Sequence, residues 1–176
     1  MAHTKDKRNK TKTLAMTALF AALSFTATAV LVIPLPSGGY LNLGDTVILL
    51  GAYLLGPVYG AAAGGIGAAL ADLTAGFAMY VPGTLAVKAV MALAAGLLYR
   101  LLHRRNFALP VCGILGETVM VGGYWLYEGL LLGSFAGAAL NIPGNLLQGA
   151  VGLAASTALA LALKKIGALH RLFPGF

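Results

Sequence analysis

Four of the five acidic residues of this 176-residue chain lie within or at the edge of long apolar stretches. They are Asp45, Asp72, Glu117 and Glu128. A charge at the centre of a membrane span costs about 2.5 kcal/mol or more, so each acid needs a partner or a function. Lys88 is the one basic residue outside three basic clusters, and Asp72, Glu117 and Glu128 are its expected partners. The set fits either an ion pair that joins helices or the wall of a polar binding site.

Helical spacing places these polar residues on shared faces. Steps of four, three and four residues connect Glu117, Val121, Tyr124 and Glu128, and shorter series connect Asn141, Asn145 and Gln148, and Thr84 and Lys88. Such faces predict an outward-open pocket in which aromatic rings stack on a flat ligand while amides and charges fix its edge. The expected walls are Tyr40, Asn42, Asp72, Tyr80, Lys88, Glu117, Tyr124, Trp125, Glu128, Asn145 and Gln148. Trp125 is equally suited to anchor a helix at the membrane interface.

The composition indicates that the elements carrying these residues are membrane helices. Hydrophobic residues make up 59% of the chain and charged residues 10%, against about 25% charged residues in a soluble domain. The basic residues cluster near residues 5–12, 100–105 and 164–171. Basic clusters beside apolar spans mark the cytoplasmic side, and we expect no nucleic-acid partner.

The number of spans depends on residues 46–73, which contain Gly56-Pro57. A turn at this dipeptide places all three basic clusters on one side of the membrane, as the positive-inside rule requires. We therefore predict an all-α membrane protein with six transmembrane helices and both termini in the cytoplasm. The predicted membrane domain is 13–165, with spans 13–33, 43–56, 57–73, 81–102, 109–132 and 142–163, between cytoplasmic tails 1–12 and 166–176.

The segment Pro34 to Asp45 is the longest polar interruption in the first half of the chain. It holds two prolines and three glycines, which end the preceding helix. Tyr40, Asn42 and Asp45 then present polar groups where a loop meets the bilayer. The segment is either a lid or wall of the polar site or an ordinary connector anchored by its tyrosine.

Several catalytic and nucleotide-binding motifs are missing from the sequence. It contains no G-x-x-x-x-G-K-[ST] phosphate loop, no H-E-x-x-H and no G-x-S-x-G. The three histidines, His3, His103 and His170, lie near basic ends and not near the acids. We therefore expect no ATPase of the chain's own, no enzymatic activity, no cofactor and no metal site.

Five short motifs carry a resemblance to a known family. They are GYLNLGD at Gly39–Asp45, LGPVYG at Leu55–Gly60, GGIG at Gly64–Gly67, ADL at Ala71–Leu73 and VK at Val87–Lys88. In combination they resemble the substrate-binding S components of energy-coupling factor (ECF) vitamin transporters. The group most similar is the riboflavin type, which also holds the hydroxymethylpyrimidine and pyridoxine types. The resemblance covers roughly Thr13 to Arg105.

This resemblance implies a function and a set of partners. The protein would be a six-helix subunit in a bacterial cytoplasmic membrane that binds a vitamin or vitamin precursor near the outer face, under the first loop. A membrane coupling subunit and two ABC-type ATPases would energise import, and the subunit would topple in the membrane to release its ligand. The pair Ala18-x-x-x-Ala22 matches the motif by which the family docks on the coupling subunit. The pocket suits a pyridine or a pyrimidine, with riboflavin as the alternative.

Two other classes of function remain open at this stage. An autonomous ion-coupled carrier or channel would use Asp72, Glu117 and Lys88 as a proton relay and would need no partner. An intramembrane enzyme would use a pair of these acids as its catalytic groups.

Overall fold

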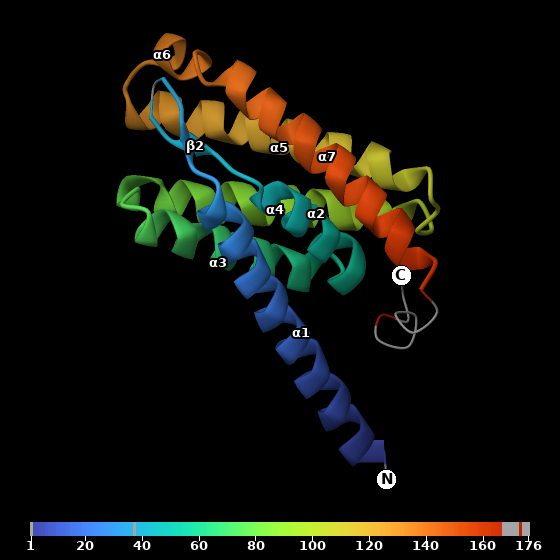
Figure 1. Ribbon diagram of the computed structural model, residues 1–176. Coiled ribbons are helices and arrows are strands. Elements are labelled where there is room, and N and C mark those ends of the chain that lie inside the picture. The colour runs from blue at the N-terminus through green and yellow to red at the C-terminus, as the bar shows by residue number, and fades with distance from the viewer. Residues whose placement is uncertain (1, 37, 167–172, 174–176) are drawn as a thin grey trace.

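The computed structural model in Figure 1 describes residues 2–36, 38–166 and 173. In this part of the chain, helices account for almost all regular structure. The α-helices are α1 (Ala2–Val30), α2 (Gly44–Leu55), α3 (Pro57–Thr74), α4 (Val81–Leu101), α5 (Ala108–Leu131), α6 (Phe135–Ala139) and α7 (Ile142–Lys164). A 3-10 turn, η1 (Ala78–Tyr80), precedes α4, and β1 (Ile33–Pro34) pairs antiparallel with β2 (Tyr40–Leu41). The predicted all-α class is confirmed.

Within the described residues, four stretches of helix are long and apolar enough to cross a membrane. They are Lys10–Val30, Ala78–Leu101, Ala108–Leu131 and Phe135–Lys164. Helix α2 is apolar but has 12 residues, which rise about 18 Å and cannot cross a hydrocarbon core of about 30 Å alone. The chain is therefore a membrane protein, while the count of six spans and the cytoplasmic placement of the termini stay predictions.

Gly56 and Pro57 make the sharp turn between α2 and α3. Gly56 has a φ of 84°, a conformation that glycine adopts without steric cost, and Pro57 takes the first position of α3. Glycines on α3 then allow close packing. A Cβ at Gly60 would lie 2.6 Å from the Cα of Ala52 on α2, and one at Gly67 would lie 2.3 Å from the carbonyl oxygen of Ala21 on α1. Helix α3 is therefore packed closely against both neighbours.

Helix α1 crosses the bundle and its N-terminal part extends away from it (Figure 1). The sequence predicts a cytoplasmic tail over residues 1–12 and a span that begins at Thr13. In the structure α1 begins at Ala2, so the basic segment belongs to the same continuous helix. The buried side chains Phe20, Ser24 and Thr28 form its inward face. Of the second predicted tail, 166–176, the structure describes Ile166 and Phe173, and the rest lies outside the described residues.

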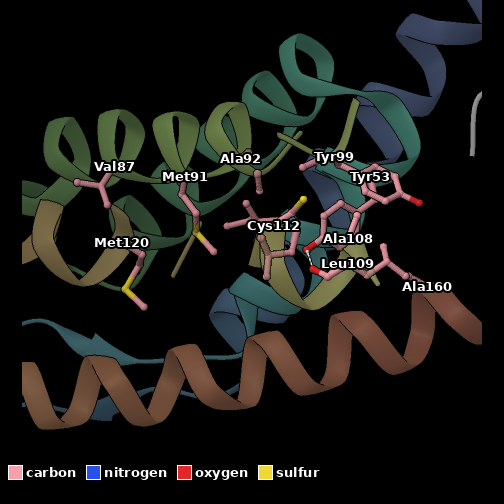
Figure 2. Packing of buried hydrophobic residues seen from close by; sticks show 14 of the residues in the cluster. Tyr53, Val87, Met91, Ala92, Tyr99, Ala108, Leu109, Cys112, Met120 and Ala160 are labelled. Atoms are coloured by element: carbon pink, nitrogen blue, oxygen red, sulfur yellow. Dashed lines mark hydrogen bonds between the residues drawn. The ribbon is translucent and has the colours of Figure 1, made fainter. Parts of the chain in front are cut away.

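The main apolar core joins α2, α4, α5 and α7. Figure 2 shows Met91 of α4, Met120 of α5, Tyr53 of α2 and Ala160 of α7 among its residues. The Tyr53 hydroxyl donates a hydrogen bond of 3.0 Å to the Leu109 carbonyl, so the one polar atom of this side chain is satisfied. This core fixes the helices that carry the polar residues described next.

Candidate ligand site

A small polar cavity of about 20 Å³ lies at the end of the bundle that carries the loop between α1 and α2. The loop, α3, η1, α4, α5 and α7 all supply side chains to it, whereas α1 supplies none. Its lining residues are Leu35, Gly39, Tyr40, Asn42, Asp72, Tyr80, Thr84, Tyr124, Glu128, Asn145 and Gln148. Eight of the eleven residues predicted from the sequence are in this set.

Tyr40 attaches the β1–β2 hairpin to α3. Its hydroxyl donates a 2.7 Å hydrogen bond to Oδ1 of Asp72. Burial, followed by the hydrogen bond to Asp72, raises the pKa of Tyr40 above its ordinary value, so the hydroxyl keeps its proton and acts as a donor. The loop lies close to η1 as well, because a Cβ at Gly38, where φ is 111°, would be 2.7 Å from the Tyr80 hydroxyl. Only glycine fits there without a shift.

Gln148 connects the loop to the interior of the bundle. Its Oε1 accepts a 2.8 Å hydrogen bond from the backbone N–H of Asn42, and its Nε2 donates one of 2.6 Å to Oδ2 of Asp45. Asp45 in turn accepts from the ammonium of Lys88 through Oδ1. A continuous polar chain therefore runs from the loop through α7 and α2 to α4.

Asn141 makes a further connection at the other side of the loop. Its Nδ2 donates to the carbonyl of Gly38 at 2.9 Å and to Oε2 of Glu128 at 3.0 Å. Together with Tyr40 and Gln148, this side chain holds the loop over the cavity. The geometry fits the lid-or-wall interpretation of the segment better than that of an ordinary connector.

The structure corrects the expected partner of Lys88. Lys88 forms its ion pair with Asp45 and not with Asp72, Glu117 or Glu128. Both side chains of the pair are 1% exposed, and the Lys88 ammonium also lies 5.2 Å from the centre of the Tyr124 ring. Asp45 reaches this depth because it stands in the first turn of α2. The sequence alone places Asp45 at the edge of the loop. Lys88, which we expected in the wall of the cavity, does not line it.

Glu117 also lies outside the cavity, although it shares a helix face with Glu128. Three turns of α5 separate the two residues, so they differ in depth. The Glu117 carboxyl packs instead against α7, where a Cβ at Gly152 would lie 2.7 Å from its Oε1. The side chain is 7% exposed, and neither of its oxygens receives a hydrogen bond within the described part of the chain.

Trp125 is the third predicted residue that the cavity does not include. It is 39% exposed, and its indole N–H donates to the carbonyl of Phe135 at 3.2 Å while its ring packs on the Phe135 ring. It therefore joins α5 to α6. Conversely, the sequence analysis missed Thr84 as a wall residue. Thr84 hydrogen-bonds the Tyr124 hydroxyl at 3.0 Å, and its helical spacing from Lys88 was the available signal.

Comparison with known families agrees with this arrangement. Residues 8–165 match the model of the family described as "ECF-type riboflavin transporter, S component". The chain belongs to this S-component family. The resemblance seen in the sequence is thereby confirmed, and the family is one of transporter subunits and not of enzymes.

Two curated relatives match nearly their whole length to this S component. The thiamine precursor transporter HmpT of Lactococcus lactis subsp. cremoris (strain MG1363) is 33% identical over 168 residues, which cover 94% of this chain and 95% of that protein. An uncharacterized protein in the gap 3′ region of Pyrococcus woesei is 37% identical over 143 residues, which cover 80% of this chain and 94% of that protein.

Proposed function

We propose that this S component captures a small vitamin or vitamin precursor in the cavity under the loop. The observation that carries the proposal is Asp72, which lines the cavity and is 4% exposed. Its Oδ1 accepts from Tyr40, while its Oδ2 receives no hydrogen bond from the described residues. A buried acceptor without a donor costs about 1–3 kcal/mol, and a ligand that donates to Oδ2 removes that cost.

The lining of the cavity favours a flat aromatic ligand. Tyr40, Tyr80 and Tyr124 line it and offer faces for stacking. The relationship to HmpT, named as a thiamine precursor transporter, supports a precursor of this kind.

We further propose that the cavity faces outward and that the basic end of the bundle faces the cytoplasm. Basic residues gather at the end of the bundle opposite the loop, at or after the far ends of α4 and α7. They are Arg100, Arg104, Arg105 and Lys164. The positive-inside rule then places both termini in the cytoplasm and the protein in a cytoplasmic membrane with six spans.

The proposed partners are a transmembrane coupling subunit and two ATPase subunits. Ala18 and Ala22 are exposed on α1, on the side opposite its buried face. Small residues four apart allow another helix to approach closely. We propose that this stripe docks on the coupling subunit and that toppling of the S component delivers the ligand.

Native mass spectrometry of the purified chain tests the assignment directly. We expect a co-purified compound of vitamin size, and isothermal titration with that compound should give one site. Asn145→Ala removes a side chain that lines the cavity, so it should weaken binding, whereas Leu147→Ala alters an exposed neighbour on the same helix and should not. Equal ligand affinity in both variants would show that the ligand does not bind in this cavity.

Glu117 supports a second candidate function, an autonomous proton-coupled carrier. Its carboxyl is buried without a hydrogen bond from the described residues and borders an apolar groove between α5 and α7. Intramembrane acids of this kind often move protons. Uptake of the identified ligand into liposomes that contain this chain alone, driven by a pH gradient, would favour the carrier over the S component.

A further inference from the structure

An apolar groove of about 420 Å³ lies between α5 and α7, away from the cavity under the loop. Ile114 and Gly122 of α5 and Leu146 and Ala150 of α7 line the groove, and all four are exposed. Both helices belong to stretches that are long and apolar enough to cross a membrane, so their exposed apolar faces contact lipid. The groove therefore opens to the hydrocarbon of the bilayer.

Glu117 is the one ionisable residue among those that line this groove. Its side chain is buried, and neither carboxyl oxygen receives a hydrogen bond from the described residues. The carboxyl lies against two glycines of α7, because a Cβ at Gly149 would be 3.1 Å from Oε2 and a Cβ at Gly152 would be 2.7 Å from Oε1. A buried acceptor without a donor is costly, so this carboxyl lacks a compensating group.

The donors nearest to Glu117 are used by other acceptors. Asp45 lies beside the carboxyl, since the same Cβ at Gly152 would be 2.8 Å from the Asp45 Cβ, and Asp45 accepts from both Lys88 and Gln148. The Thr118 hydroxyl, which also lines the groove, donates to the carbonyl of Ile114 at 2.8 Å. A donor for Glu117 would therefore come from a molecule in the groove.

The depth of Glu117 limits what that molecule can be. Helix α5 runs from Ala108 to Leu131, so Glu117 lies about 14 Å along the axis from one end and about 21 Å from the other. The headgroup of a phospholipid lies outside a hydrocarbon core of about 30 Å, too far from the middle of the helix to supply the donor. The donor must belong to a molecule that is otherwise apolar and dissolves in the hydrocarbon.

An amine matches the carboxyl better than other single polar groups. An uncharged amine that takes the carboxyl proton onto its nitrogen, and an ammonium that meets a carboxylate, give the same net-neutral pair with an N–H donor. Such charge-assisted hydrogen bonds are roughly twice as strong as the neutral bond that an alcohol would make. A carboxylic acid would add a second acidic group beside Glu117 and Asp45.

We propose that the groove between α5 and α7 is a lateral binding site for a lipophilic amine dissolved in the membrane, and that Glu117 binds its nitrogen. The groove shares no lining residue with the cavity under the loop. This second site is entered from the bilayer, and its ligand differs in kind from a water-soluble vitamin.

Fluorescence quenching of Trp125 tests the inference. Trp125 is the only tryptophan of the chain and lies one helical turn from Gly122 on α5. The full-length chain in phosphatidylcholine vesicles is titrated with three nitroxides of one ring skeleton, 4-amino-TEMPO, 4-hydroxy-TEMPO and TEMPO, which quench tryptophan at short range. We expect a saturable phase with the amine at an affinity about 10-fold or more above that of the hydroxyl compound. TEMPO should quench in simple proportion to its concentration.

Two variants assign the saturable phase to the groove. Glu117→Gln keeps the shape of the side chain but removes the acid, so the amine should bind about 10-fold or more weakly. Gly122→Leu fills the groove and should abolish the phase. A Cβ at Gly122 meets no atom within 4 Å, and leucine favours a helix more than glycine does, so this variant should fold. Ala158→Leu, at an exposed position of α7 outside the lining, is the matched control and should keep the phase.

Three results would overturn the proposal. Proportional quenching by all three nitroxides in the unmodified chain would show that the groove holds none of them. Equal saturable quenching by TEMPO and the amine would show an apolar site, suited to an acyl chain or a partner helix, that does not use Glu117. Unchanged amine affinity in Gly122→Leu would place the bound amine elsewhere. Melting in detergent checks the fold of each variant, and Gly122→Leu decides alone where Glu117→Gln does not fold.

Discussion

Lys88 of α4 forms its ion pair with Asp45 of α2, and each side chain is 1% exposed. Removing one partner of such a pair leaves an uncompensated buried charge and costs about 3–5 kcal/mol. We therefore expect Lys88→Met to lower the free energy of unfolding by about this amount in the apo protein. Melting in detergent with and without ligand measures the effect, which should appear in both states.

Replacing both partners distinguishes a structural pair from a ligand-binding charge. The double variant Asp45→Asn/Lys88→Met removes both charges together, so we expect it to melt closer to the unmodified protein than Lys88→Met does. A ligand affinity that falls in Lys88→Met while the apo melting temperature stays unchanged would assign Lys88 to the binding site instead.

Gln148 should control how long the loop stays closed. It joins the Asn42 backbone to Asp45 through hydrogen bonds of 2.8 and 2.6 Å, so Gln148→Leu releases the loop and leaves a buried N–H and a carboxylate oxygen without this partner. We expect the ligand to dissociate about 10-fold faster, since changes at one interface act mostly on the off-rate. Stopped-flow release measures it, and unchanged release would show that the loop is held by Tyr40 and Asn141 alone.

The exposed stripe of α1 should serve docking and not ligand binding. Ala18→Leu/Ala22→Leu adds bulk where close helix approach is expected, so we predict loss of co-purification with the coupling subunit and loss of uptake. Ala154→Leu/Ala158→Leu is the matched control, because these alanines are also exposed and four residues apart, on α7. If the two pairs reduce uptake equally, or if the α1 pair weakens ligand binding, the stripe has another role.

Glu117 is predicted to reduce stability without contributing to ligand affinity. Glu117→Met replaces a buried carboxyl that has no hydrogen-bond partner among the described residues with an apolar side chain of similar length. We expect the free energy of unfolding to rise by about 1–3 kcal/mol and the ligand affinity to stay unchanged. A drop in ligand affinity would show that Glu117 contributes to the ligand site.

Much of the architecture could be predicted from local signals in the chain. Apolar length and the low content of charged residues identified an all-α membrane protein, and the structure turns between α2 and α3 at Gly56-Pro57, where glycine and proline are the local cause. Helical spacing also grouped Tyr124 with Glu128, and Asn145 with Gln148, and all four line the cavity. These signals depend on residues close together in the sequence.

The remaining features depend on how the helices rotate and how deep each residue lies. Glu117 and Glu128 share a face of α5, but one packs on Gly152 of α7 and the other reaches the cavity. Asp45 looked like a loop residue until α2 was seen to bring it to Lys88. Spacing along one helix contains no information about which neighbour a given turn meets, so these partners could not be predicted from the sequence.

The absence of α1 from the cavity wall has an evolutionary consequence. If the cavity binds the ligand as we propose, we expect substitutions that change which compound is recognised to fall on the loop, α3, α4, α5 and α7, and substitutions that change docking to fall on α1. Mutations can therefore alter one trait with little effect on the other. On the proposed function, we expect that a lineage can acquire a new ligand preference while it keeps the same coupling subunit.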